Sequence, residues 1–242
     1  MAFASVGTLG GISDISAGTS IVMTTEAAAE AGNIVIVTVG KDNASSSDGN
    51  TSEVTSVTDS AGNTYTKARE FCNSQAAANA GATVAVYYSR LASQLDLGGT
   101  ITASFSDTRT ASSIFAWEFT GTAISVDGTP VDLANDGADA GSMALSGLTN
   151  AEHIFFRGIA VETGSVIGIT PTTSYTGHDG PAGGVGAAGM ATQGEFIIAT
   201  ATGHTSDPDS DDGDQAAVFI GFIEQAAGGT STPTRMMMGV GT

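Results

Sequence analysis

Basic residues are scarce in this sequence. Only seven of its 242 residues are lysine or arginine, against 25 aspartate and glutamate residues, so the formal net charge is −18. A protein that binds nucleic acid needs a basic surface to neutralise phosphates, and anionic membrane surfaces repel a chain of this charge. We therefore expect neither nucleic acid nor a membrane among its partners. The acidic balance suits solubility, divalent cations or a salty medium, and charge alone does not separate these three.

Cysteine is nearly absent, and export signals and long apolar runs are lacking. The single cysteine, Cys72, excludes an internal disulfide and a cysteine zinc site, and we expect it to be buried as a small apolar side chain. No basic residues precede an apolar run at the N-terminus, unlike in a secretory signal peptide, and no apolar stretch reaches the roughly 20 residues of a membrane helix. We expect a protein made in the cytoplasm of its host and soluble there.

Helical patterns are missing almost throughout. Residues 26–30 predict at most one helical turn, which is too short to be stable alone. The rest of the chain predicts about a dozen short strands, spaced as in a β-sandwich, with no clear internal repeat and no proline-rich linker. The sequence therefore predicts an all-β fold, with a single jelly-roll-like antiparallel β-sandwich over residues 1–225 and a flexible C-terminal tail over residues 226–242.

Strand candidates are densest in residues 82–117. Tyr87 and Tyr88 must point to opposite faces of one strand, so they do not form a shared platform for stacking on a sugar. Trp117 and Phe119 share a face, and because aromatics make up only 6% of the chain we expect both in the sandwich core. Sugar binding through Trp117 is the alternative.

Between the strands, turn-forming residues predict several connections. Residues 59–63 predict a tight hairpin turn, and residues 33–39 a strand buried on both faces. The turn-rich segment 121–140, the glycine-rich segment 177–194 and the acidic segment 205–214 are expected to be loops.

Several of these segments together resemble a pattern found in bacteriophage and bacterial proteins. The pattern comprises the apolar run at 33–39, the turn and strand at 57–68, the aromatic strand at 84–90, the strand at 100–105, the Ala-Trp-Glu-Phe-Thr-Gly segment at 116–121 and the Pro-Val-Asp turn at 130–132. The resemblance covers residues 30–135 and, more loosely, the strands up to residue 223. It implies a jelly-roll-like β-sandwich in a structural protein of a phage virion, and it carries over no catalytic residues.

The acidic loop holds the strongest candidate for a metal site. Carboxylates alternate at Asp207, Asp209 and Asp211, with Asp214 close behind. Oxygen ligands at alternate positions before a turn can wrap a hard cation such as Ca²⁺. The loop departs from an EF-hand, because Asp212 stands where that motif has glycine and no bidentate glutamate follows. The alternative is a solvated turn between two strands, and we expect the protein to require no other cofactor.

Catalytic motifs are not visible, and we do not expect an enzyme. His153, His178 and His204 are far apart in the sequence, and we expect them to be single surface histidines. No Gly-x-Ser-x-Gly elbow occurs, and the glycines of residues 180–189 lack the strand-then-helix context of a phosphate-binding loop. A hydrolase is therefore the last of our hypotheses.

The tail ends in Arg235, Met236, Met237 and Met238. Consecutive methionines are unfavourable in water, and beside a linker of glycine, serine and threonine they indicate an arm that docks on a neighbouring subunit. A frayed terminus is the alternative.

Together these features predict a non-enzymatic structural protein of a bacteriophage virion. We expect a capsid decoration or cement protein that acts as a homo-oligomer, through contacts with itself and with other virion proteins such as the major capsid protein. A tail or neck protein is the second hypothesis in this class. A carbohydrate-binding or receptor-binding β-sandwich module is the hypothesis from another class.

Overall fold

The computed structural model describes residues 2–42, 49, 52–73, 81–136, 141–162, 168–180, 189–209 and 213–224. Within these ranges every regular element is a β-strand, and every strand pair is antiparallel. The prediction of an all-β protein with antiparallel, sandwich-like packing is therefore confirmed. The same residues include no helix long and apolar enough to cross a membrane.

Strands from the first half of the chain form two sheets. A five-stranded sheet has the order β1-β8-β3-β6-β5, and a three-stranded sheet has the order β2-β7-β4. They enclose a first core that contains Val35 and Val37 of the larger sheet and Ile101 and Ala103 of the smaller one. The strand bounds are β1 Ala4–Asp14, β2 Gly18–Thr24, β3 Ile34–Asp42, β4 Val54–Asp59, β5 Thr66–Cys72, β6 Ala82–Arg90, β7 Thr100–Arg109 and β8 Ser112–Thr120.

Strands from the second half form two further sheets. The larger has the order β12-β13-β11-β15-β9, and the smaller pairs β10 with β14. Leu145, Phe155 and Phe219 lie in the core between them. The strand bounds are β9 Ser125–Asp136, β10 Met143–Leu145, β11 Ala151–Glu162, β12 Thr176–Asp179, β13 Met190–Ala201, β14 His204–Ser206 and β15 Asp214–Ile223.

The two halves have the same strand order. Replacing β1, β8, β3, β6 and β5 by β9, β15, β11, β13 and β12 converts the first five-stranded sheet into the second. The pair β2-β7 corresponds to β10-β14, and an isolated bridge between Thr170 and Asp209 takes the place of the β4–β7 pairing. Tyr65 and Tyr175 are both buried directly before the edge strands β5 and β12. The chain is thus a structural repeat that its sequence did not reveal.

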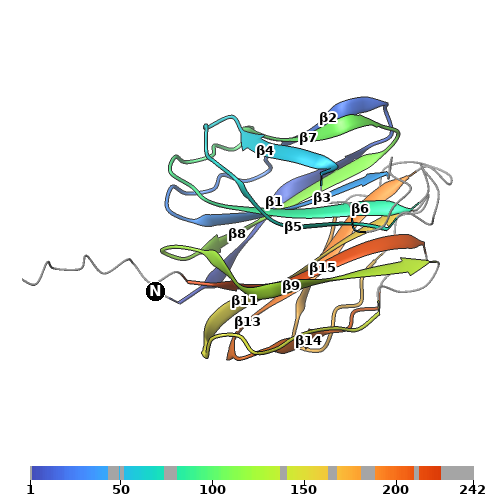
Figure 1. Ribbon diagram of the computed structural model, residues 1–242. Helices are drawn as coiled ribbons and strands as arrows, with labels where there is room; N and C mark the ends of the chain where they lie inside the picture. The colour runs from blue at the N-terminus through green and yellow to red at the C-terminus, as the bar shows by residue number, and fades with distance from the viewer. Residues whose placement is uncertain are drawn as a thin grey trace, which may run out of the picture.

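The halves pack against each other through their five-stranded sheets. Ile34 and Ile36 of β3 share a core with Ile154 and Phe156 of β11. Figure 1 shows the resulting layers, with β2, β7 and β4 at one side, the two large sheets in the middle and β14 at the other side. The sequence predicted one sandwich of two sheets, whereas in the described part of the chain the strands form four stacked sheets.

Burial in the central strands follows from this stack. All nine residues of β3 are buried, as predicted, because cores lie on both faces of its sheet. Tyr87 packs in the core of the first half while Tyr88 packs against the core between the halves, which confirms that they point to opposite faces. Cys72 is buried, also as predicted.

Two loop predictions were wrong, and residues 26–30, predicted to form at most one helical turn, form none. The turn-rich segment 121–140 contains β9, which accommodates Pro130 because it is an edge strand whose register shifts opposite the Phe219–Gly221 step. The glycine-rich segment 177–194 includes most of β12 and the start of β13.

Candidate functional site

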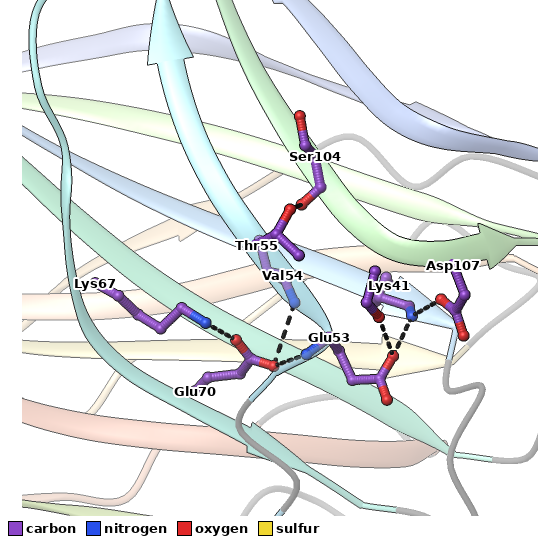
Figure 2. Close-up of polar contacts among 9 residues, drawn as sticks. Lys41, Glu53, Val54, Thr55, Lys67, Glu70, Ser104 and Asp107 are labelled. Carbon is purple, nitrogen blue, oxygen red and sulfur yellow. Dashed lines mark hydrogen bonds and ion pairs between the residues drawn. The ribbon is translucent and has the colours of Figure 1, made fainter.

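A cluster of charged side chains lies between the two sheets of the first half. Lys41 lies near the end of β3, Glu53 directly precedes β4, and Asp107 lies on β7; we call these three residues the Lys41 cluster. Lys41 Nζ donates to Glu53 Oε2 at 2.5 Å and to Asp107 Oδ1 at 2.7 Å, as Figure 2 shows. The side chain of Lys41 is 0% exposed, that of Glu53 6% and that of Asp107 42%. The cluster therefore reaches solvent at Asp107.

Glu70 on β5 holds the backbone beside this cluster. Its Oε1 accepts hydrogen bonds from the backbone N–H groups of Glu53 at 2.6 Å and Val54 at 3.2 Å, and its Oε2 pairs with Lys67 (Figure 2). Burial raises the pKa of Glu70, and the bonds from Lys67 and the two amides oppose this rise. Because Glu70 ties down the start of β4, it positions the Glu53 side chain.

Hydroxyl and aromatic groups surround Lys41. Thr83 and Ser112 are its direct neighbours on β6 and β8, so their side chains share its face of the sheet. Both are 0% exposed, and neither hydroxyl has a hydrogen-bond partner among the described residues. The ring of Phe105 lies 5.9 Å from Lys41 Nζ. The nitrogen is thus buried, with two carboxylates as its charged neighbours.

This arrangement differs from an ordinary ion pair in its burial. An exposed lysine–carboxylate pair changes stability by at most about 1 kcal/mol, whereas a buried one must compensate the loss of water around both charges. Two carboxylates at hydrogen-bonding distance supply that compensation for Lys41. They also place the amino group of Lys41 beside the carboxyl carbon of Asp107 and beside the Glu53 carboxylate, which can accept a proton.

The Asp59 turn, which is part of the phage-like pattern, is structural. Asp59 Oδ1 accepts from the backbone N–H groups of Ala61 and Asn63, and Oδ2 accepts from the Tyr65 hydroxyl at 3.1 Å. Asn63 Oδ1 in turn accepts from two backbone N–H groups of the β6–β7 connection, including that of Ala92. The motif therefore fastens one loop to another. The tight turn predicted at residues 59–63 is confirmed, but the predicted hairpin is wrong, because β4 and β5 on either side of the turn belong to different sheets and are linked here by the isolated Thr58–Thr64 bridge.

An open cleft of about 510 Å³ lies beside this turn, at the end of β4 opposite to Glu53. Small or polar residues line most of it, with Asp96 as its one carboxylate, and Leu97, which is 68% exposed, is also among the lining residues. Because the cleft contains few converging charged groups, the Lys41 cluster is the stronger candidate.

The histidines do not converge, but two of them are buried, so the expectation of surface histidines was wrong. His153 is 0% exposed and its Nε2 lies 2.9 Å from Asp127 Oδ2. His178 is 4% exposed and stacks on Phe115 with ring centroids 4.4 Å apart. Neither ring nitrogen of His178 has a hydrogen-bond partner among the described residues, and burial lowers its pKa to about 3.

The predicted calcium ligands are described in part. Asp207 and Asp209 follow β14, Asp214 begins β15, and Asp211 lies outside the described residues. Asp209 uses its backbone to pair with Thr170. The residues that the structure describes include no group of three or more acidic, histidine or cysteine side chains suited to a metal ion. Because Asp211 is not among them, the calcium site stays a prediction.

The remaining predicted sites are the Trp117 and Phe119 pair, which the structure describes, and the C-terminal tail, which it does not. Trp117 packs against the core between the halves and donates from Nε1 to Ser5 Oγ, and Phe119 is 0% exposed in the same core. The predicted place in the core is confirmed for Phe119, whereas Trp117 is partly buried against that core. The tail residues Arg235, Met236, Met237 and Met238 lie outside the described residues.

Sequence patterns did not point to the Lys41 cluster. Its residues are spread over three segments that only folding brings together, and the available signal was a lysine at the end of a continuous apolar strand. Comparison of the chain with protein-family models, curated proteins and solved structures found no match.

Proposed function

We propose that this protein is a non-enzymatic structural component of a bacteriophage virion, a decoration or cement protein of the capsid. The observation that carries the proposal is the strand order. Strands β1-β8-β3-β6 face β2-β7-β4, which is the alternation of a jelly roll, a fold used by viral capsid domains. The edge strand β5 departs from that arrangement by joining β6. The same order recurs in the second half, so the chain offers two such units in one stack.

A contact surface suited to assembly lies on β1 and β2. Val6, Ile12, Ile15 and Val22 are four of the five large apolar side chains that are exposed among the described residues. β1 and β2 are edge strands of their sheets, and Asp14 is the single charged residue between positions 2 and 25. In a chain with a net charge of −18, an apolar face with a single charged residue is where a second acidic copy approaches with least repulsion.

The position in the virion is tested by copy number. Quantitative mass spectrometry of purified particles is expected to find the protein in hundreds of copies, as a lattice-wide decoration requires. A few copies per particle would indicate the alternative, a tail or neck protein. Absence from purified particles would contradict both.

The contact surface is tested by size-exclusion chromatography with light scattering. We expect the wild-type protein to form a homo-oligomer and Val22→Asp to dissociate it, because a carboxylate would be buried at the contact. Leu97→Asp is the matched control, since Leu97 is also exposed but lies in the β6–β7 connection. An oligomer that survives Val22→Asp and Ile12→Asp together would show that this face is not the contact.

A further inference from the structure

We propose that Lys41 and Asp107 condense to form an intramolecular amide bond, with Glu53 as the proton carrier. The bond would join β3 of the central sheet to β7 of the outer sheet, two segments separated by 66 positions in the chain. It is a covalent fastening of the first sandwich that goes beyond the structural role proposed above and does not depend on it.

Geometry brings the reacting groups together. Lys41 Nζ lies 2.7 Å from Asp107 Oδ1, and both side chains project from strands of facing sheets, which limits their freedom to separate. Reacting atoms held about 3 to 3.5 Å apart in a fixed orientation react as if at very high concentration. The nearest second carboxylate, Glu53 Oε2, lies 2.5 Å from the same nitrogen and also accepts from Ser106 Oγ at 3.4 Å.

Burial favours the neutral product. In bulk water, hydration of an ammonium and a carboxylate opposes their condensation. Lys41 is 0% exposed, with Phe105 beside it and Thr83 and Ser112 as its neighbours in the sheet, so its ammonium lacks that hydration, while the Asp107 carboxylate keeps part of its own. Condensation replaces the Lys41 ammonium and the Asp107 carboxylate by a neutral amide, and the Glu53 carboxylate stays beside it as the remaining charge.

The reaction balances without a cofactor. Glu53 takes one proton from the Lys41 ammonium, and the lone pair of the resulting amine attacks Cγ of Asp107. A C–O bond of the Asp107 carboxyl breaks as the N–C bond becomes an amide. Two of the three ammonium protons leave with that oxygen as one water molecule, both transferred through Glu53. The third proton stays on the amide nitrogen, and Glu53 returns to its starting form.

Asp107, rather than Glu53, is the acceptor because of its position. Its side chain is 42% exposed, so the departing water has a path to solvent, whereas the side chain of Glu53 is 6% exposed. Glu53 is further held by its backbone, through the bond from its N–H to Glu70 and the bond from Ser106 N–H to its carbonyl oxygen. It is the more fixed of the two carboxylates, as a proton carrier should be.

The bond is tested by measuring the intact mass of the full-length protein under denaturing conditions. The expected mass is one water molecule below the sequence mass, and tryptic digestion should leave the Lys41–Asp42 bond uncut and yield a branched peptide that joins Lys41 to Asp107. An intact mass equal to the sequence mass would overturn the proposal and leave an ion pair.

Variants assign the roles. Asp107→Ala retains the Lys41–Glu53 pair and is expected to fold, to have its full sequence mass and to be cut after Lys41. Lys67→Arg alters the other lysine of the chain and should keep the deficit. A deficit that persists in Asp107→Ala would come from another reaction, such as succinimide formation at Asp127–Gly128, and would overturn the proposal. Glu53→Gln should abolish or strongly slow the loss of water, and unchanged loss would refute its role as proton carrier.

Discussion

Two titratable residues, the buried His178 and the partly buried Glu162, give the protein opposite responses to pH. His178 has a lowered pKa because it is buried against Phe115 and no described group bonds to its nitrogens. Burial raises the pKa of Glu162 to about 7, and the carboxylates of Asp42 and Asp214 add to this rise. Both residues lie where the two halves of the molecule meet, so both report on the packing of the halves.

His178 is expected to destabilise the fold in acid. The folded protein takes up the His178 proton only near pH 3, whereas the unfolded chain takes it up near its ordinary value of 6.5. The free energy of unfolding should therefore fall by up to about 1.4 kcal/mol per pH unit between pH 6.5 and 3 on account of this residue. Replacement by phenylalanine should remove that part of the slope, as measured by urea unfolding at pH 5 and pH 8. An unchanged difference between the two pH values would contradict this role.

Glu162 acts in the opposite direction. Its folded-state pKa lies above the ordinary 4.5, so the folded state holds the proton more tightly and loses stability as pH rises from 4.5 to 7. Glu162→Gln keeps an oxygen that can accept from Gly81 N–H and should stabilise the protein at pH 8 by about 1 to 2 kcal/mol, with no gain at pH 4. Equal effects at both pH values would show that ionisation is not the cause.

At the scale of the elements, Gly194 at the end of the glycine-rich segment allows close packing. A side chain at Gly194 of β13 would lie 2.2 Å from the carbonyl oxygen of Arg157 and 2.5 Å from His178 Nε2. Position 194 of β13 must therefore carry no side chain, because β11 and the His178 ring approach the backbone there. A segment that looks like a loop by composition is in part a strand whose neighbours leave no room for a Cβ atom at position 194.

Gly194→Ala is expected to cost about 3 kcal/mol of unfolding free energy, because backbone atoms of a central strand cannot yield easily. Gly168→Ala is the control, since the nearest atom to its added Cβ lies 4.0 Å away. Chemical denaturation compares the two. Equal stabilities of the two variants would show that the approach at Gly194 is less close than described.

The acidic segment after β14 gives a second prediction at this scale. If it binds Ca²⁺, millimolar Ca²⁺ should raise the melting temperature, by an amount equivalent to about 2.7 kcal/mol at a hundred times the dissociation constant. Asp209→Asn combined with Asp211→Asn should abolish the shift, while Asp96→Asn, at the distant cleft, should retain it. No shift in the wild-type protein would end the calcium hypothesis.

At the scale of the whole molecule, the core between the two halves makes each half depend on the other. Ile34, Ile36 and Phe119 line the first half of this core, and they face Ile154 and Phe222 of the second. Separation would expose an entire apolar sheet face, and exposed faces of that kind drive association.

Residues 1–122 expressed alone are therefore expected to associate, as dimers through this face or as aggregates. Light scattering at several concentrations measures the state. The combined variant Ile36→Lys and Val86→Lys in the same fragment should reduce the association, because both residues belong to the core that would be exposed. A fragment that is monomeric and stable without these changes would show that the halves are independent.

The sequence by itself determined the strands and much of their burial. The continuous apolar run of β3 predicted a strand between two cores, and the alternate faces of Tyr87 and Tyr88 followed from strand geometry. Local signals suffice there because each residue's face depends on its own strand. The same signals misassigned β9, since only its place at a sheet edge explains why Pro130 is tolerated.

The tertiary structure alone decided the repeat and the Lys41 cluster. Two halves of different sequence share one strand order, because apolar side chains of many kinds fill a core equally well when their faces alternate correctly. Lys41, Glu53 and Asp107 meet because β3, β4 and β7 belong to facing sheets, and no spacing in the sequence encodes that meeting. Composition predicted an acidic β protein with few cations, and packing placed one of its two lysines between two carboxylates in the core.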